Sequence, residues 1–205
     1  MRQEQKLMRQ GYALVAGVDE AGRGTWAGPV IAAAVILPRN AMRLAALRGV
    51  RDSKLLTPHQ REALFECIHQ VAVAVGMGTA THSEIDEHGI VPATRAAMQR
   101  AIESLAPAPH ALVIDAVKLD VPLPQCVMFH ADTLCLSVAA ASIIAKVTRD
   151  RLMIKLDAQH PGYGLAQHKG YGTRQHQLAL AELGPCAIHR MTFEPVRLAA
   201  IAVES

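Results

Sequence analysis

Two short apolar segments joined by a glycine-rich turn constrain the fold of this chain more than any other feature. Residues 12–18 (YALVAGV) and residues 30–37 (VIAAAVIL) each have the length of one strand and are bounded by turn residues. Uninterrupted apolar runs of this length are typical of buried strands. The sequence therefore predicts that the chain opens with two strands of a sheet.

Helix and strand patterns alternate along the rest of the chain. Helical patterns occupy residues 58–71, 83–105 and 134–159, and strand patterns occupy residues 71–78, 110–115 and 125–129. The first of these helices has a start signal at Thr57, and His160 with Pro161 ends the last. We expect residues 83–105 to form a short helix followed by a longer one. The alternation predicts an α/β fold with a mixed sheet flanked by helices.

The last part of the chain is expected to be a small appendage of the same domain. Residues 162–173 (GYGLAQHKGYGT) are glycine-rich, basic and aromatic, which predicts a mobile surface loop, and one helix and a tail are expected after it. With 205 residues, 51% of them hydrophobic, the chain can bury one sizeable core. We predict a single domain over residues 1–205, in which residues 174–205 form a C-terminal helical extension.

The sequence carries no pattern typical of membrane insertion or export. The longest apolar run, residues 26–37, is interrupted by Gly28 and Pro29 and is too short to span a bilayer. Residues 1–9 are charged and polar, without the apolar core of a secretion signal. We therefore expect a cytoplasmic protein with no membrane partner, and a monomer because heptads are absent.

Charge and cysteine content constrain the function loosely. The four cysteines are widely spaced and form no C-x-x-C pair, so we expect buried, reduced thiols. The formal net charge is +3, and residues 139–205 hold eight Lys and Arg against five Asp and Glu, whereas the preceding residues are balanced. A polyanionic partner would suit this excess, but a mixed solvated surface looks much the same.

Acidic residues at the ends of apolar strands are the first sign of chemistry. Asp19 and Glu20 end the first strand pattern, Asp115 ends the strand pattern of residues 110–115, and Asp132 precedes the long helix. A buried carboxylate needs a metal ion or a base beside it. Carboxylate oxygens suit hard cations such as Mg²⁺ and Mn²⁺, and four of them can hold two ions. Two ions could catalyse phosphodiester hydrolysis.

Two structural conditions accompany this metal-site hypothesis. Neighbours on a strand point to opposite faces, so Asp19 and Glu20 share a site only if the strand ends there. The N-terminus of the long helix is expected to keep Asp132 ionised. Taken singly, each carboxylate could equally be an ordinary cap, turn or ion-pair residue.

A glycine-arginine-glycine turn, residues 22–24, follows the acidic pair directly. Glycine lets the backbone approach a ligand closely, and Arg23 offers a fork of hydrogen-bond donors. In isolation, a tight connection between two strands would explain the turn as well.

The longer motif, VDEAGRGTWAGPVIAAAVIL, resembles the opening motif of the type 2 ribonucleases H, the ribonuclease HII family. The resemblance continues through DSK at residues 52–54, VIDAVKL around Asp115, DTLCLSVAAASIIAKVTRDR from Asp132, HKGYGT, and IHRMTFEPV. It covers nearly the whole chain. It implies a ribonuclease H-like fold and an endonuclease that acts on RNA·DNA hybrids and cuts 5′ to single ribonucleotides in duplex DNA, leaving 3′-hydroxyl and 5′-phosphate ends.

The resemblance also implies roles for individual residues. Asp19, Glu20, Asp115 and Asp132 would be the catalytic carboxylates that bind two Mn²⁺ or Mg²⁺ ions. Gly22, Arg23 and Gly24 would contact the ribose 2′-hydroxyl, the group that distinguishes RNA from DNA. Tyr171 would pack on the deoxyribose that follows the ribonucleotide, and Lys54 would contact phosphate. His168 and Lys169 either bind phosphate or solvate a loop.

Other residues have no expected chemical role or depart from the family pattern. The small residues 139–142 are expected to be a packing surface, and Lys146, Arg149 and Arg151 cannot all share one helix face. His130 and Ala131 replace a common Lys-Gly, and Ala116 replaces a common glycine. Gly89 and Pro92 fall where the family has asparagines, which puts contacts to the nucleic-acid backbone there in doubt.

Three alternative functions compete with the nuclease interpretation. Another ribonuclease H-like metal nuclease would use the same carboxylates without sensing ribose, which the turn at residues 22–24 and Tyr171 argue against. A module that binds hybrids without cutting them is argued against by the presence of all four carboxylates. A nucleotide-dependent enzyme is disfavoured because no phosphate-binding G-x-x-x-x-G-K-[ST] motif occurs.

Overall fold

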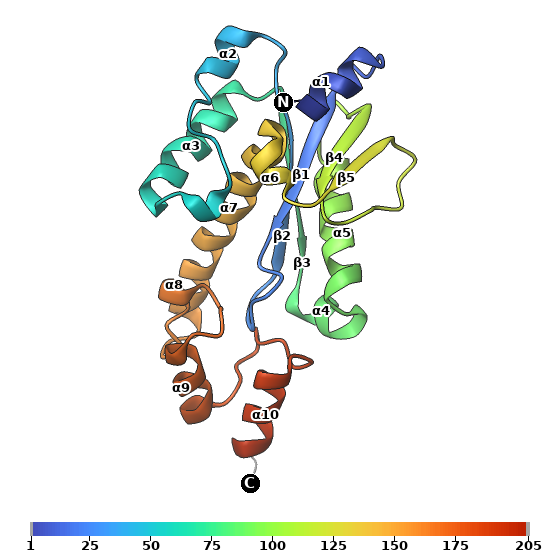
Figure 1. The fold of residues 1–205 in the computed structure, drawn as a ribbon. Coiled ribbons are helices and arrows are strands. Elements are labelled where there is room, and N and C mark those ends of the chain that lie inside the picture. Colours follow the sequence, from blue (N-terminus) through green and yellow to red (C-terminus); the bar gives the residue numbers. More distant parts are fainter. Residues whose placement is uncertain (1, 204–205) are drawn as a thin grey trace.

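The computed structural model describes residues 2–203 and contains one five-stranded sheet (Figure 1). The strands are β1 (Val15–Ala21), β2 (Val30–Ile36), β3 (Ala74–Ala80), β4 (Ala111–Asp115) and β5 (Gln125–Met128), in the order β3-β2-β1-β4-β5. The β1/β2 and β2/β3 pairs are antiparallel, whereas β1/β4 and β4/β5 are parallel. The predicted mixed sheet is therefore confirmed.

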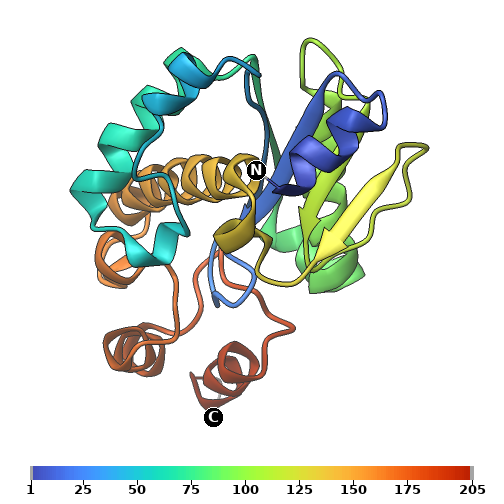
Figure 2. The same ribbon diagram turned by 45° about the horizontal axis from the view of Figure 1, so that its top comes forward.

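Helices cover both faces of the sheet (Figures 1 and 2). They are α1 (Arg2–Arg9), α2 (Ala41–Ala45), the 3₁₀ turn η1 (Ser53–Leu55), α3 (Pro58–Val71), α4 (His82–His88), α5 (Ile90–Glu103), α6 (Ala131–Leu134), α7 (Leu136–Gln159), α8 (Leu165–His168), α9 (Arg174–Leu183) and α10 (Glu194–Val203). Alternate residues of β2 face opposite layers: Ala32 and Ala34 pack with α5, whereas Ala33 and Val35 pack with α7 and α3. This alternation explains why the β2 pattern is apolar throughout.

Helix α7 lies unusually close to β1. A Cβ atom at Gly17 would fall 2.3 Å from backbone atoms of Ser137 and Val138, so only glycine fits there. Ala140 and Ala141 of the same helix are fully buried in the core. The predicted packing surface of small residues is confirmed, and the close approach fixes α7 beside the end of β1 that carries the acidic pair.

Two predictions for the C-terminal part are wrong. The segment 162–173 is no mobile surface loop, because it contains α8 and buries Tyr163 and Leu165, and the Tyr163 hydroxyl donates to the Gly184 carbonyl at 2.7 Å. Positive φ angles at its glycines, such as 94° at Gly162, allow the chain to fold back on itself. Two helices, α9 and α10, follow where one was expected.

Other expectations fare differently. The helix pair α4 and α5 and the start of α3 after Thr57 are confirmed, while α1 and α2 were not predicted. All four cysteines are free, but of them only Cys135 is buried. In the described part of the chain, no helix is long and apolar enough to cross a membrane. The single domain with its extension at 174–205, the monomeric state and the cytoplasmic location stay predictions.

Candidate active site

The acidic residues come together where β1 and β4 lie side by side. The two strands run parallel with Val18 opposite Ile114, so the next residues, Asp19 and Asp115, lie at the same end of the pair. The Ala131 amide, at the start of α6, donates to Asp115 Oδ1 at 3.0 Å. This bond ties β4 to the helix that carries Asp132.

The expectation that β1 ends at the acidic pair is wrong. β1 continues to Ala21 through its pairing with β2, in which Asp19 lies opposite Ala33 and Glu20 opposite Ala32. Its pairing with β4, however, stops at Val18. Both side chains can therefore reach one hollow, because β1 has lost its second neighbour at that point, and the Glu20 amide donates to Asp19 Oδ1 at 2.8 Å.

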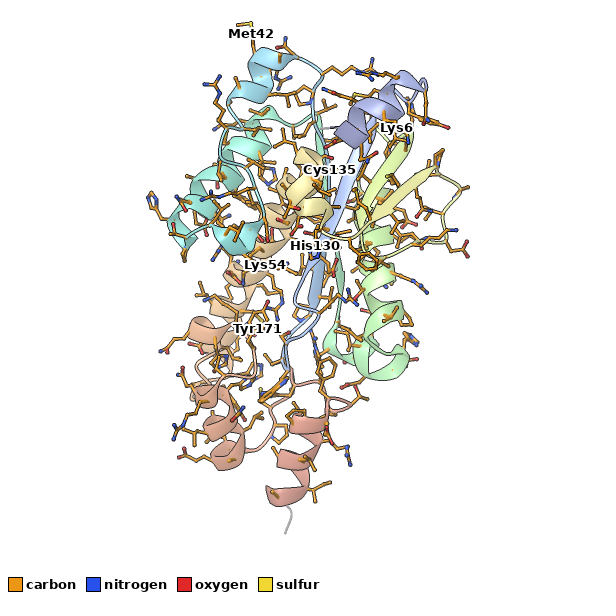
Figure 3. All side chains as sticks on the ribbon, viewed as in Figure 1. Lys6, Met42, Lys54, His130, Cys135 and Tyr171 are labelled. Carbon is orange, nitrogen blue, oxygen red and sulfur yellow. The ribbon has the colours of Figure 1, made fainter. Side chains whose placement is uncertain are left out.

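A cavity of about 280 Å³ joins these residues to the turn and to the loop after α8. The predicted site residues that line it are Asp19, Glu20, Gly22, Arg23, Gly24, Lys54, Asp115 and Tyr171. The remaining one, Asp132, does not line the cavity, but its Oδ2 lies 3.8 Å from Lys54 Nζ. Figure 3 shows Lys54, His130 and Tyr171 around this central region, between α7 and the sheet. The structure thus brings the predicted residues into one place.

Burial and mutual repulsion make the cavity costly for negative charge. Burial raises the pKa of Asp19 well above its ordinary value, and neighbouring Glu20, Asp115 and Asp132 raise it further. Burial also raises the pKa of Glu20, although Arg23 opposes it through a contact of 3.2 Å with Glu20 Oε1. These carboxylates would be stabilised by additional positive charge.

Asp132 differs from its expectation in two ways. It lies inside the four-residue helix α6, separate from the long helix α7. Its pKa is raised, by burial and then by Asp52, so the helix terminus does not by itself keep the carboxylate ionised. Lys54 opposes this shift. Burial alone would lower the pKa of Lys54, but Asp52 and Asp132 raise it overall.

Gly22 is required by its surroundings, whereas Gly24 is not. Gly22 has a φ of 97°, and a Cβ atom there would fall 2.1 Å from Arg149 Nε. A Cβ atom at Gly24 would meet no heavy atom within 4 Å. Packing against Arg149 therefore requires glycine at position 22, whereas Gly24 has open space around its Cα atom.

Two buried arginines hold the turn from behind. Arg149 of α7 donates to the Pro29 carbonyl at 2.9 Å, the Lys169 carbonyl at 2.8 Å and the Thr25 hydroxyl at 2.8 Å. Arg190 donates to the carbonyls of residue 22 at 2.7 Å, residue 23 at 2.8 Å and residue 28 at 2.9 Å. Both are at most 1% exposed.

Sequence reasoning missed the role of these arginines, although one had a signal. Arg149 falls four residues after Ala145 and four before Met153, and both of those are fully buried. A charged residue on the buried stripe of a helix must have internal partners. For Arg190, in a segment without periodicity, the sequence offers no such signal.

Residues that the sequence left open now have definite surroundings. His168 is buried, its Nε2 lies 2.7 Å from the Tyr163 carbonyl and its Nδ1 accepts from the Gly170 amide, so it supports the loop. Lys146 lies over the Tyr171 ring, 5.5 Å from its centroid. Arg151 pairs with Glu62 and Glu66 away from the cavity. The expectation that Lys146, Arg149 and Arg151 do not share one face is confirmed.

The fold and the site together define a protein of the ribonuclease H-like class. The sheet is mixed, its strands β1 and β4 are parallel, an acidic cavity lies where these two strands end their pairing, and α7 covers one face of the sheet. The family model described as Ribonuclease HII matches residues 16–196. The chain belongs to the ribonuclease HII family, whose members cleave the RNA of RNA·DNA hybrids, and the predicted family and fold class are confirmed.

Individual relatives support this family assignment. The chain is 52% identical over 195 residues to a ribonuclease HII of Citrifermentans bemidjiense, which covers 95% of this chain and 83% of the relative. The ribonuclease H2 of Pyrococcus horikoshii OT3 superposes with a TM-score of 0.78 at 31% identity, covering 94% and 99% of the two chains. A Bst-RNase HIII solved in complex with Mn²⁺ shares the fold, with a TM-score of 0.67 at 22% identity over 94% and 71%.

Proposed function

We propose that this protein is a divalent-metal-dependent endonuclease that cuts RNA within RNA·DNA hybrids and cuts 5′ to single ribonucleotides embedded in duplex DNA, leaving 3′-hydroxyl and 5′-phosphate ends. One observation carries the proposal: a single cavity is lined by three of the acidic residues, by the turn at residues 22–24 and by Tyr171. Acidic groups for hydrolysis and groups suited to reading a sugar thus face the same space. We further propose that it acts in the cytoplasm.

The side chains around the cavity suit a divalent ion by their chemistry. Carboxylate oxygens are the ligands that Mg²⁺ and Mn²⁺ prefer, and added positive charge would relieve the raised pKa of buried Asp19. Among the described residues, no three acidic, histidine or cysteine side chains converge closely enough to hold an ion as they stand. Instead, Arg23 and Lys54 contact Glu20 and Asp132, at 3.2 Å and 3.8 Å. Binding of a divalent ion would therefore require Arg23 and Lys54 to move away from these two carboxylates.

In the proposed mechanism, Asp19, Glu20, Asp115 and Asp132 would hold two Mn²⁺ or Mg²⁺ ions. Bound there, the ions would supply an activated water and stabilise the leaving oxygen of an in-line displacement. The protein's own contribution is positional: the Ala131 amide orients Asp115, and the Glu20 amide orients Asp19.

The sugar would be recognised beside this acidic cluster. The backbone of Gly22 and Gly24 and the guanidinium of Arg23 would contact the ribose 2′-hydroxyl. Tyr171, 41% exposed, would pack its ring on the following deoxyribose. Lys54, whose side chain is 80% exposed, would swing toward a substrate phosphate. Together these contacts favour a ribonucleotide followed by DNA.

Cleavage of end-labelled duplexes tests the proposal. A duplex with one ribonucleotide, an all-DNA duplex and a long RNA·DNA hybrid are incubated with Mg²⁺, Mn²⁺ or a chelator. We expect a metal-dependent cut 5′ to the lone ribonucleotide and no cut in all-DNA. Cleavage of the hybrid alone would remove the sugar-reading role of Arg23 and Tyr171. Binding without cleavage under either ion would favour a non-catalytic module.

A further inference from the structure

A second hollow adjoins the acidic cavity and shares Tyr171 with it. Its volume is about 310 Å³, and it lies between α3, α7 and the segment of α8. Lys146 and Tyr171 line both hollows, so the two are neighbours that share one wall. We call this hollow the lysine groove and define it by Arg61, Lys146, Asp150, Lys169 and Tyr171.

The lysine groove carries a surplus of positive charge around one carboxylate. Lys146 Nζ lies 2.7 Å from Asp150 Oδ1, and Arg61 Nη2 lies 3.9 Å from Asp150 Oδ2. Lys169 also lines the groove and interacts electrostatically with Asp150. Three cations thus share one anion. At the rim, the charge of Arg151 is already offset by Glu62 and Glu66.

Arg61, Lys146 and the Asp150 carboxylate between them are partly removed from water. The side chains of Arg61, Lys146 and Asp150 are 13%, 19% and 18% exposed. Arg61 is further fixed through the carbonyls of Ser53 and Leu56, at 2.9 Å and 2.6 Å. An anion entering such a site meets preorganised charge in a medium less polar than bulk water, which strengthens the attraction.

The position of the groove indicates which anion it would take. Because Tyr171 lines both hollows, a strand that places one sugar on its ring lies next to the acidic cavity and next to the lysine groove. The next repeating anion along a nucleic-acid strand is a phosphodiester. Lysine binds phosphate as a mobile point charge and needs no fixed fork geometry.

We propose that the lysine groove binds the DNA backbone 3′ to the ribonucleotide, with Lys146 and Lys169 donating to the phosphodiesters beyond the sugar on Tyr171. Asp150 holds Lys146 and is itself held by Arg61, and the Lys169 ammonium donates to the Ala166 carbonyl. The inference rests on the proposed function, since that function sets the strand direction. It assigns Lys169 to phosphate binding, while His168 remains a support of the loop.

Neutral-backbone interference tests the groove. Duplexes with one ribonucleotide carry a single methylphosphonate at the second, third or fourth linkage 3′ to it, and both cleavage and the Kd in the presence of chelator are measured. Wild-type protein is compared with Lys169→Gln and Lys146→Gln. The matched control is Lys155→Gln, an exposed lysine of the same helix α7 that does not line the groove. Thermal unfolding confirms that each variant folds.

In wild-type protein, one of the neutral linkages should raise the KM and the Kd by about three- to tenfold, as expected for one partly exposed charge-assisted contact. Lys169→Gln should cause a similar loss with the normal duplex, and the neutral linkage should then add nothing. Each lysine variant should also lower the salt dependence of log Kd by about one. Lys155→Gln should behave as wild type.

The inference is overturned if neutral linkages weaken binding equally in wild type and in both groove variants, or if none of the three 3′ linkages affects the KM or the Kd of wild-type protein. Failure of the proposed function looks different. In that case wild-type protein would leave every ribonucleotide substrate uncut, while the comparison of Kd values would still support or refute the groove.

Discussion

The two sides of the candidate active site are built on opposite principles. The acidic side gathers the like charges of Asp19, Glu20, Asp115 and Asp132, and Arg23 and Lys54 oppose them at Glu20 and Asp132. The supporting side contains buried Arg149 and Arg190, whose guanidinium groups are hydrogen-bonded to carbonyl and hydroxyl oxygens. Charge is left under-compensated where a ligand is expected and is fully satisfied where geometry must be maintained.

A histidine relay extends the supporting side. The Cys186 amide donates to His189 Nδ1 at 2.9 Å, the Nε2 atoms of His189 and His176 are 2.9 Å apart, and His176 Nδ1 lies 3.0 Å from the Tyr171 carbonyl. Two neutral rings satisfy all these contacts when His189 Nε2 and His176 Nδ1 carry the protons. The relay therefore reaches the backbone of the residue proposed to contact the sugar.

The comparison predicts opposite stability effects on the two sides. A carboxylate whose folded-state pKa is raised destabilises the fold as pH rises above its unfolded pKa, so its removal should stabilise the protein at neutral pH. A buried, fully bonded arginine behaves in the reverse way, because its loss leaves several carbonyls without partners.

The largest effect is expected from Asp19→Asn. Removing this carboxylate should lower the cleavage rate at least about a thousandfold, as when a residue that acts only in the transition state is lost. Hybrid binding should persist, and the thermal unfolding temperature should rise at pH 7.5 because like-charge repulsion is relieved. Asp120→Asn, at an exposed acidic residue, is the control and should change neither the cleavage rate nor the unfolding temperature. Normal turnover by Asp19→Asn would contradict the assignment of Asp19 to the metal site.

Arg190→Met should break the supporting side. It leaves the carbonyls of residues 22, 23 and 28 without their donor, which should cost about 3–5 kcal/mol of unfolding free energy. Displacement of the turn should also lower cleavage roughly a hundredfold. Urea unfolding and single-turnover assays measure the two effects.

Arg197→Met, at an exposed arginine of α10, serves as the control for that variant. Arg190→Lys should recover part of the stability but little of the selectivity for a ribonucleotide, since one ammonium cannot reach all three carbonyls. Wild-type selectivity in Arg190→Lys would show that the turn does not depend on this arginine.

The sequence predicted the acidic side far better than the supporting side, for a physical reason. Asp19 and Asp115 stand out locally, because each follows an apolar run of the sequence and charge at such a position is unusual. Arg190 instead contacts residues more than 160 positions earlier, and nothing in its own neighbourhood indicates burial. Long-range contacts of a charged residue cannot be read from local periodicity.

The fold shows the same division. The strands and α3 were predicted because their patterns are local, whereas the segment 162–173 was wrongly expected to be mobile. Its glycines suggested a flexible backbone. In the structure, their positive φ angles instead allow tight turns, and Tyr163 donates to the Gly184 carbonyl. Likewise, the strand end at Glu20 was mispredicted because one neighbouring strand stops and the other continues.

Acid should weaken the histidine relay. Burial lowers the pKa of His176 and of His189 to about 4, below the ordinary 6.5. The unfolded chain therefore takes up protons first as pH falls, and stability that is complete above pH 6.5 is lost toward pH 4. Between pH 7 and 5 the loss should be on the order of 2–4 kcal/mol for the pair.

Urea unfolding at several pH values measures this dependence. His176→Gln should flatten it, whereas His59→Gln, at an exposed histidine, should retain the wild-type slope. An unchanged slope in His176→Gln would mean that the buried ring is not the group that titrates. Such a result would weaken the contrast between an acidic side whose charges are under-compensated and a supporting side whose polar groups are fully hydrogen-bonded.

The smallest effect is expected at Ala116, directly after Asp115. Its φ of 55° lies in the left-handed region, where glycine is favoured. Relief of this strain, less the entropy cost of glycine, should make Ala116→Gly more stable by about 0.5–1 kcal/mol. Ala63→Gly, at an exposed position inside α3, should instead cost about 1 kcal/mol. If Ala116→Gly is stabilised but loses activity, the strained residue itself helps to aim Asp115, and the acidic side would then be as strictly positioned as the supporting one.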